Sequence, residues 1–286
     1  MNTALQQWLD ETLAVLVLYK TPLNSADTFI SLTASLKAND TSLDLFVYDN
    51  SPTATLAPFS NQNWKITYLH DCSNPGVSKA YNEGAKKANQ LGKKWLLLLD
   101  QDTIFTENAI TSYFRGVTEY PSENCFVPQL IDVNGIISPF KFRSGNGFRV
   151  KSVSKGVYSL NGLQFVNCGV IVRLDTFEVA NGFNEKLKLD FSDLAFIGRL
   201  KRNHSQFVVL DLIGKHSLSG SIKKTLQEDI ERFRMYCNAA IEFKKTEMNN
   251  NLNLSFCIVP HALKLCIKHR TIIFLKVAIH SIANAY

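Results

Sequence analysis

The chain has 286 residues, of which 45% are hydrophobic, so it can bury a large core and is too apolar for a disordered protein. Its formal net charge of +6 is modest for this length and does not indicate a nucleic-acid partner. The six cysteines show no C-x-x-C pair and no regular spacing, which argues against a zinc site or a disulfide framework and favours reduced thiols in a cytoplasm.

The first apolar run, LAVLVLY at residues 13–19, follows Asp10 and Glu11, where a signal peptide would carry positive charge. Seven residues are also too few to cross a bilayer. We therefore expect a cytoplasmic protein whose first core strand is this run.

Strand-like and helix-like segments alternate through the first half of the chain. Between the first two strands, Ser25 is expected to cap a helix with apolar residues at helical spacing. A second helix should follow the turn at Asn74-Pro75-Gly76 and end at Gly92. The predicted strands are residues 13–19, 43–49, 65–70 and 94–100. This alternation predicts an α/β fold with a mostly parallel sheet flanked by helices.

Small side chains recur every four residues in the second predicted helix, at Ala80, Gly84 and Ala88. Such a stripe predicts that the helix approaches the sheet closely. Asn82 lies on a different face and is harder to explain by packing.

The second half of the chain is less regular. Residues 138–156 are rich in Gly, Ser and cations and predict a long mobile loop. These cations could close over a diphosphate, or they could simply be solvated. They are Lys141, Arg143, Arg149, Lys151 and Lys155. Further strands are expected at 165–174 and 207–212, with a loop and a helix between them and helices from about residue 222 onward.

The stretch KKWLLLLDQDT runs an apolar strand into Asp100 and Asp102. About 0.7 D-x-D triplets are expected by chance in this chain, so the triplet alone proves nothing. This pair, however, follows a strand that reads as buried on both faces, and open α/β sheets bind ligands at the carboxyl ends of such strands. Mg²⁺ is typically held by one or two carboxylates together with substrate phosphates. The pair therefore predicts a Mg²⁺ or Mn²⁺ site for a diphosphate. Asp49 ends another predicted strand and could contact a ribose or a base, or only begin a turn.

Several motifs occur in order over residues 13 to 220: LVLYK, VYDNS, the spaced residues from Asn74 to Gly84, LLLLDQD, NGFNEKLKLDFSDLAFIGRL and KHSLSG. Together they resemble the family 2 glycosyltransferases, and among these the bacterial rhamnosyltransferase-like members. The resemblance implies an A-type glycosyltransferase fold and metal-dependent, inverting transfer of a hexosyl or rhamnosyl group. The implied donor is a nucleoside diphosphate sugar of the UDP or dTDP type. The implied acceptor is a glycan or a lipid-linked molecule in the synthesis of a bacterial surface polysaccharide such as O-antigen or capsule.

The resemblance also implies residue roles. Asp102 would hold the metal with or without Asp100, and His216 would lie near the metal or the diphosphate. A carboxylate of LDFSD, Asp193 or alternatively Asp190, would be the general base. The positions expected to bind the donor are Tyr19, Asp49, Asn74, Gly76, Asn82, Asp100 and Gln101.

Two other functions compete with this interpretation. The D-x-D pair also resembles that of haloacid dehalogenase-type phosphatases, although it follows the fourth predicted strand here, and such enzymes usually carry it on the first. A nonenzymatic nucleotide-sugar-binding protein on the same fold is the second alternative. The carboxylates at 102 and 193 argue against it.

We expect a catalytic domain over residues 1–220, with a donor half at 13–103 and an acceptor half at 104–220. A basic, amphipathic helical extension should follow at 221–286. After Glu247 the chain has no acidic residue, while the segment from Pro260 mixes apolar residues with Lys264, Lys268, Arg270 and Lys276. This segment could pack on the protein, form a homodimer contact, or lie on the anionic inner face of the cell membrane.

Overall fold

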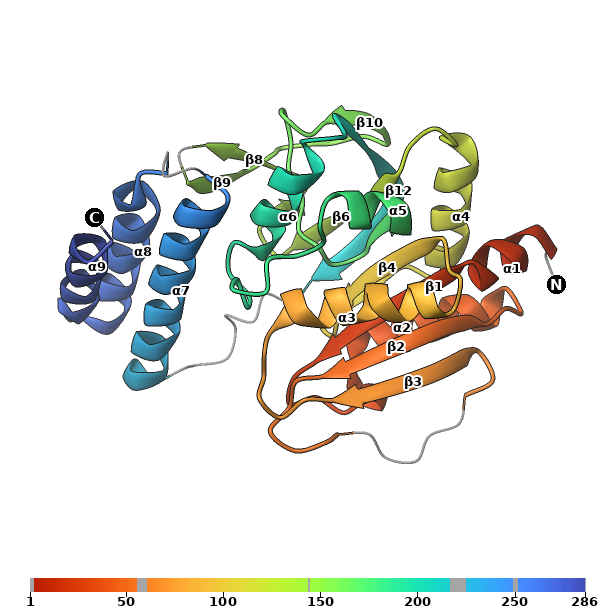
Figure 1. The fold of residues 1–286 in the computed structure, drawn as a ribbon, viewed down its shortest axis with the longest axis horizontal. Coiled ribbons are helices and arrows are strands. Elements are labelled where there is room, and N and C mark those ends of the chain that lie inside the picture. The colour runs from red at the N-terminus through yellow and green to blue at the C-terminus, as the bar shows by residue number, and fades with distance from the viewer. Residues whose placement is uncertain (1–2, 56–60, 144, 217–224, 249–251, 286) are drawn as a thin grey trace.

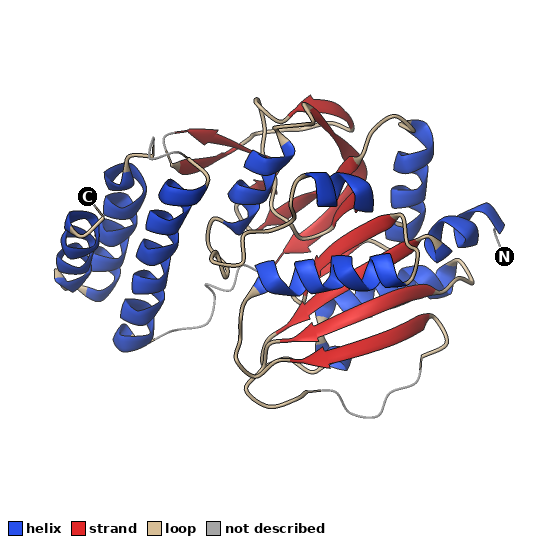
Figure 2. Ribbon diagram, viewed as in Figure 1, coloured by secondary structure: helices blue, strands red, loops and turns tan. Residues whose placement is uncertain are grey.

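The computed structural model describes residues 3–55, 61–143, 145–216, 225–248 and 252–285. Helices cover both faces of a central sheet, and a separate group of helices lies at one end of the molecule (Figures 1 and 2). This arrangement confirms the predicted α/β fold with a helical C-terminal part.

The first half of the sheet is parallel and contains the four predicted strands. They are β1 (Thr12–Leu18), β2 (Leu43–Asp49), β3 (Trp64–His70) and β4 (Trp95–Asp100), arranged in the order β4-β1-β2-β3. Leu18 pairs with Asp49 and Val17 pairs with Asp100, so these strands end at the same edge of the sheet. Both aspartates therefore lie at the edge where the sequence predicts the ligand.

The second half of the sheet is mixed. Beyond β4 the order continues through β11 (Val170–Arg173), β6 (Cys125–Asp132), β12 (Gln206–His216) and β10 (Gly156–Ser159). Strand β11 is antiparallel to both of its neighbours. Two short strands complete the sheet, because β5 (Thr103–Phe105) pairs with β12 and β7 (Gly135–Ser138) pairs with β6. The strand predicted at 165–174 begins only at Val170, because Gly169 has a φ of 78° and interrupts the extended backbone.

Two hydrophobic cores lie on opposite faces of the sheet, and β1 alternates its side chains between them. Ala14, Leu16 and Leu18 face the helices α1 (Thr3–Asp10), α2 (Asp27–Ala38) and α4 (Ala109–Glu119). Leu13, Val15 and Val17 face α3 (Val77–Gln90), α5 (Leu174–Val179) and α6 (Ser192–Leu200). The uninterrupted apolar strand in the sequence is thus explained by burial on both faces.

Helix α3 approaches the sheet as its small side chains predict. Ala80 and Ala88 are completely buried, and a Cβ atom added to Gly84 would lie 2.4 Å from Cγ2 of Val15. No larger residue fits at position 84 without displacing the strand side chain.

Two local predictions were wrong. Ser25 does not cap α2, because it ends a short 3₁₀ turn, η1 (Leu23–Ser25), and the helix begins after Ala26 with no side-chain cap. The segment predicted as a long loop instead contains a hairpin of β8 (Phe140–Arg143) and β9 (Asn146–Arg149). Gly145, with a φ of 83°, lies in the turn of this hairpin, whereas Lys141, Arg143, Gly147 and Arg149 lie in its strands.

The C-terminal helices are α7 (Leu226–Thr246), α8 (Leu254–His269) and α9 (Ile273–Ala283), and Pro260 lies inside α8. They share a third core that includes Phe233, Phe243 and Phe274. We call residues 226–283 the helical extension. Among the residues that the structure describes, no helix has both the length and the apolar character needed to span a membrane.

Ion pairs attach the helical extension to the segment around α6. Arg232 binds both carboxylate oxygens of Asp190, and the Nη2 atom of Arg199 lies 2.7 Å from Oε1 of Glu247. The Glu247 side chain is only 3% exposed. The extension is therefore joined to the segment around α6 by partly buried charge pairs, whose loss would leave an unpaired charge behind.

Gly76, in the turn before α3, provides a test of how closely this turn packs against the backbone at Lys188. It has a φ of 97°, and an added Cβ atom would lie 2.2 Å from the backbone oxygen of Lys188. We expect Gly76→Ala to lower the free energy of unfolding by about 3 kcal/mol or more, because backbone strain and overlap both contribute. Gly92→Ala is the matched control, since Gly92 has a φ of 65° and open space around it; its cost should be about 1 kcal/mol. Equal urea-unfolding midpoints for the two variants would contradict the close contact at Lys188.

Candidate active site

The acidic pair lies where β4 ends and the chain turns into β5. Asp100 is the last residue of β4, and Gln101 and Asp102 form a turn rather than a continued strand. The hydroxyl of the fully buried Tyr81 donates to Oδ1 of Asp100 at 2.7 Å. Asp100 is thereby fixed by α3, the same helix that lies closely on β1.

Strand pairing brings His216 to this turn. The last residue of β12, His216, pairs with Thr103, the first residue of β5. Its Nδ1 atom lies 2.7 Å from Oγ1 of Thr103 and 3.5 Å from Oδ1 of Asp102. Residues that are far apart in the sequence are therefore neighbours, as the predicted role of His216 requires.

The N-terminus of α2 also holds the turn. The hydroxyl of Thr28 donates to the backbone oxygen of Thr103 at 2.9 Å and accepts from the backbone N–H of Thr103 at 3.0 Å. The backbone N–H of Thr28 donates to the oxygen of Gln101 at 3.4 Å. Contacts with the rest of the fold replace the serine cap that the sequence suggested.

Asp193 stands in the first turn of α6, after Phe191 in a left-handed conformation with a φ of 63°. The side-chain amide of Asn167 donates to Oδ1 of Asp193. Burial, followed by the negative charge of Asp100, raises the pKa of Asp193 to about 7. A carboxyl group with this pKa is suited to act as a general base near neutral pH.

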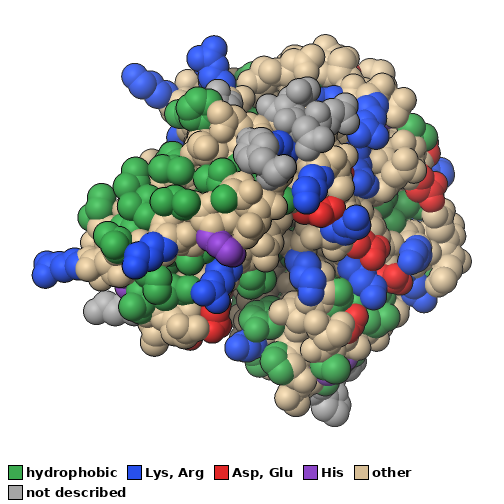
Figure 3. Space-filling model, turned by 60° about the vertical axis from the view of Figure 1, so that its left-hand side comes forward, with side chains coloured by type: hydrophobic (Ala, Val, Ile, Leu, Met, Phe, Trp, Pro, Cys, Tyr) green, Lys and Arg blue, Asp and Glu red, His purple; other side chains and the backbone are tan. Residues whose placement is uncertain are grey.

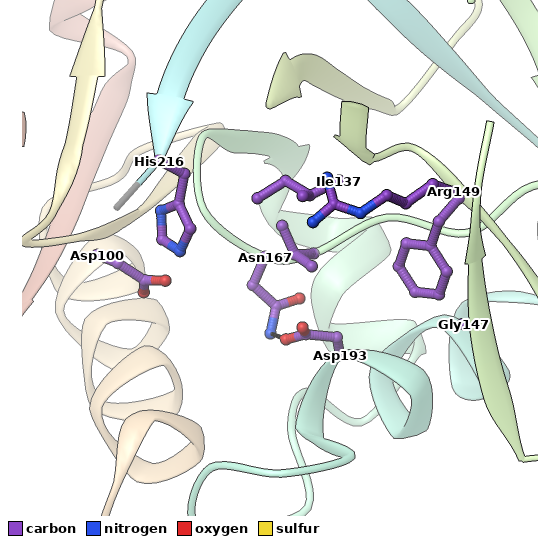
Figure 4. Close-up of a pocket in the computed structure, with 9 residues that line it drawn as sticks. Asp100, Ile137, Gly147, Arg149, Asn167, Asp193 and His216 are labelled. Carbon is purple, nitrogen blue, oxygen red and sulfur yellow. Dashed lines mark hydrogen bonds between the residues drawn. The ribbon is translucent and has the colours of Figure 1, made fainter. Parts of the chain in front are cut away.

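A cavity of about 350 Å³ is lined by Asp100, His216 and Asp193, whereas Asp102 does not line it. Figure 4 shows Asp100 and His216 on one side of it and the hydrogen-bonded pair of Asn167 and Asp193 facing them. The full lining is Asp100, Ile137, Phe140, Gly147, Arg149, Val166, Asn167, Asp193 and His216. The cavity thus combines carboxylates with an aromatic and aliphatic wall, a composition typical of small-ligand sites.

Arg149 reaches this cavity from the hairpin that the sequence suggested would be a loop. Its guanidinium donates to both oxygens of Asp132, at 2.6 and 2.5 Å. Of the other loop cations, Lys155 pairs with Glu119 at 2.9 Å. The five predicted loop cations therefore do not act together, and of these only Arg149 lines the cavity.

Asp190, the alternative base, is not among the residues that line the cavity. Its carboxylate is held by Arg232 of α7 through both oxygens. Both oxygens of this carboxylate are thus engaged within the chain. The geometry therefore favours Asp193 over Asp190.

Several predicted donor-binding residues make contacts within the chain. Asp49 is completely buried and accepts hydrogen bonds from Ser51, Thr55 and Tyr68. Burial raises its pKa, but these hydrogen bonds outweigh burial and lower the pKa to about 2. Asp49 thus organises the loop after β2, as the turn interpretation of this residue suggested. Asn82 bonds the backbone of Phe183 in both directions, at 2.9 and 3.0 Å, so its side chain ties α3 to the segment before α6.

The other predicted donor positions shape the same edge of the sheet. Gln101 accepts from the N–H of Tyr19 at 2.7 Å, which links the ends of β1 and β4. Asn74, with a φ of 47°, and Gly76 form the turn that starts α3. The Tyr19 side chain is 42% exposed and so remains accessible to a ligand.

Tyr81 and Asn167 are site residues that the sequence reasoning missed. Tyr81 adjoins Asn82 within the recognised motif, so its position carried a weak signal. Asn167 lies between strands with no motif around it and is placed only by the fold. It is 3% exposed, and its Oδ1 atom has no hydrogen-bond partner within the described chain. A buried carbonyl oxygen of this kind is a ready acceptor for a substrate hydroxyl.

Residues 23–148 match the model of glycosyl transferase family 2. These residues therefore form a glycosyl transferase family 2 domain. The recognition made from the motifs and the predicted enzyme class are thus confirmed, and the assignment disagrees with the phosphatase alternative. Asp193 and His216 lie beyond the matched segment, so their roles rest on the geometry described above.

The crystal structure of residues 1–349 of S. aureus TarS is similar to this glycosyltransferase, with a TM-score of 0.50 and 15% identity over 84% of this chain and 73% of that chain. The structure of the same TarS piece in complex with UDP gives a TM-score of 0.51 at 14% identity, with the same coverage of both chains. At this identity the likeness concerns the fold alone. No curated protein matches the sequence.

The side chains around Asp102 supply too few ligands to hold a divalent cation without help from a substrate. Within the described ranges, no group of three or more His, Cys, Asp or Glu side chains is arranged to hold an ion. Burial raises the pKa of Asp102, the nearby His216 partly offsets this, and Asp100 raises it further. Crowded carboxylates of this kind fit a cation that they share with the phosphates of a substrate, since Mg²⁺ commonly takes only one or two protein carboxylates.

The hydrogen bond from Asn167 gives a prediction about Asp193. Because the amide stabilises the ionised carboxylate, Asn167→Leu should raise the pKa of Asp193 by about one unit. The measurement is a ¹³C NMR titration of labelled aspartate carboxyls, with the Asp193→Asn variant assigning the signal. Gln90→Leu, an amide lost from the exposed end of α3, is the control and should leave that pKa unchanged. A pKa that stays the same in Asn167→Leu would show that the bond does not hold the charge.

Proposed function

We propose that this family 2 glycosyltransferase moves a hexosyl or rhamnosyl group from a nucleoside diphosphate sugar of the UDP or dTDP type to a hydroxyl group of a glycan or a lipid-linked acceptor. The reaction inverts the anomeric centre. The main observation behind the proposal is that Asp100 and Asp193, which are far apart in the sequence, line the same cavity. The structural likeness to a TarS piece that binds UDP supports the choice of donor class.

The donor would bind at the carboxyl edge of the parallel strands. Asp102 would hold a Mg²⁺ or Mn²⁺ ion with the donor diphosphate, Asp100 would assist, and His216 would lie beside them. Such an ion, when bound, supplies positive charge that stabilises the leaving nucleoside diphosphate. Tyr81 and Thr103 keep Asp100 and His216 in place through the hydrogen bonds described above.

Asp193 would remove the proton from the acceptor hydroxyl as the hydroxyl oxygen attacks the anomeric carbon. The base must lie apart from the metal ligands and face the acceptor, and Asp193 comes from α6 rather than from the donor half. Phe140 and Val166 supply apolar surface at the same cavity, against which the face of a sugar ring can pack.

The biological setting is proposed from the motif resemblance. Similarity to bacterial rhamnosyltransferase-like members supports a role in building a surface polysaccharide such as O-antigen or capsule. We also propose that residues 1–220 form the catalytic domain and that residues 221–286 are an addition to it. The boundary at 220 lies outside the described residues.

Asp193→Asn tests the base. We expect kcat to fall at least about 100-fold while binding of UDP is retained, because the amide cannot accept the proton. Asp190→Asn is the matched control and should keep a much larger share of turnover. If only Asp190→Asn shows the loss of kcat, the two roles are exchanged. If the wild-type chain and both variants bind UDP but transfer no sugar, the nonenzymatic alternative would be supported.

The raised pKa of Asp193 gives a pH dependence. Below about pH 7 the carboxyl is protonated, so kcat/KM should fall about tenfold per pH unit on the acidic side. The unfolded carboxyl titrates near pH 4, so folding takes up a proton between about pH 4 and 7, and this group makes the protein less stable as pH rises through that window. Asp193→Asn should remove this contribution and be at least as stable as the wild type at pH 8. A less stable variant at pH 8 would mean that its lost activity reports misfolding.

Ligand stabilisation tests the donor and the metal together. UDP or dTDP with Mn²⁺, at about 100 times its Kd, should stabilise the fold by about 2.7 kcal/mol. Asp102→Asn should reduce that shift in unfolding temperature, and EDTA should remove most of it. Full transferase activity in EDTA would contradict the metal requirement.

A further inference from the structure

The outer surface of the helical extension is apolar at several well-spaced positions. On α8, Phe256 is 57% exposed and Ile267 is 79% exposed, with Leu263 between them at helical spacing. At and within α9, Ile272 and Ile279 are 63% and 66% exposed. These five side chains are called the outer face. Large apolar side chains exposed in this number mark an interaction surface rather than ordinary solvated surface.

Cations accompany the outer face and acids do not. Lys264 in α8, Arg270 directly after α8 and Lys276 in α9 are exposed, and the chain has no Asp or Glu after Glu247. Figure 3, which turns this end of the molecule toward the viewer, shows hydrophobic and cationic side chains intermixed on it, with the acidic side chains mainly elsewhere. The surface therefore suits a partner that is both apolar and negatively charged.

Two hollows open on this end of the molecule. One, of about 480 Å³, lies between α7 and α9 and is lined by Arg234, Asn238, Lys276, His280 and Ser281, with aliphatic neighbours. The other, of about 590 Å³, is lined by Leu263, Ile267, Arg270 and Ile272 among others. None of the residues lining either hollow is acidic. The first supplies hydrogen-bond donors for phosphate oxygens, and the second supplies apolar surface beside a guanidinium.

We propose that the outer face, with its cations, docks on an anionic phospholipid bilayer. The aliphatic side chains enter the interface, and Lys264, Arg270 and Lys276 meet the lipid phosphates. A second copy of the chain fits less well, because a two-fold contact places the same patch against itself and would bring uncompensated cations together. Charge complementarity thus selects the membrane.

A hydrogen bond joins the docking surface to the hairpin beside the cavity. The side-chain amide of Asn146, in the hairpin, donates to the backbone oxygen of Phe256 at 2.8 Å, and the adjacent Gly147 lines the cavity. The hairpin lies between the extension and the sheet (Figure 1). A docked enzyme would hold its cavity beside the lipid surface. This consequence rests on the proposed function, whereas the docking itself does not.

The experiment is flotation of the full chain with vesicles of phosphatidylcholine and phosphatidylglycerol at 50 mM salt, compared with phosphatidylcholine alone. We expect binding to the anionic vesicles only, with strong weakening at 500 mM salt. Replacing Lys264, Arg270 and Lys276 with Gln should lower the partition coefficient about 100-fold. The matched control replaces Lys37, Lys65 and Arg115, exposed cations of the sheet domain, with Gln and should bind as the wild type does.

A second variant tests the apolar part. Ile267→Glu with Ile279→Glu should also abolish flotation, and Val133→Glu, at a 99% exposed site between β6 and β7, should not. Failure of the intact chain to float with anionic vesicles at 50 mM salt would overturn the proposal. If the intact chain is instead a dimer by analytical ultracentrifugation and the Ile267→Glu, Ile279→Glu variant is a monomer, the outer face is a contact between copies. Stabilisation by UDP and Mn²⁺, measured on the same samples, reports separately on the proposed function.

Discussion

The crowding of carboxylates at one edge of the sheet is the constraint on which the rest of the site depends. Asp100, Asp102 and Asp193 lie close enough for Asp100 to raise the pKa of both of the others, and burial adds to the effect. Repulsion of this kind would spread the groups apart unless the fold fixed each one. Tyr81 fixes Asp100 and Asn167 fixes Asp193. The unbalanced negative charge that results suits a cation, which could in turn attract a diphosphate, and it keeps the Asp193 carboxyl group basic enough to accept a proton.

The fold brings these groups together from four separate segments. The ends of β4 and β12 meet through the short strand β5, while α6 presents its first turn from the other side of the cavity. The helical extension contributes from outside, because Arg232 holds Asp190 only three positions before Asp193. The extension is thus attached to the chain beside the proposed base.

The sequence predicts the parts of this arrangement that depend on local periodicity. Strands β1 to β4 are buried on one or both faces and show it in their apolar runs, and the stripe from Ala80 to Ala88 shows how α3 packs. The start of α2 at Asp27 and the hairpin at 140–149 were missed because contacts with distant residues decide them, such as the bond from Thr28 to Gln101 and the pairing of Phe140 with Gln164. Asn167 and the partner of Asp190 could not be found for the same reason. The residues next to Asn167 and Asp190 in the sequence show no pattern that would predict a contact with a distant part of the fold.

The most direct test of the account is the pKa of Asp193 in the Asp100→Asn variant, measured by ¹³C NMR of the carboxyl group without any ligand. The substitution removes a charge but keeps an oxygen that can accept from Tyr81. If the two carboxylates share one electrostatic site, the pKa of Asp193 will fall from about 7 toward its ordinary value. A pKa that does not change would show that Asp100 and Asp193 act independently. The single site for donor and acceptor, on which the proposed mechanism rests, would then be contradicted.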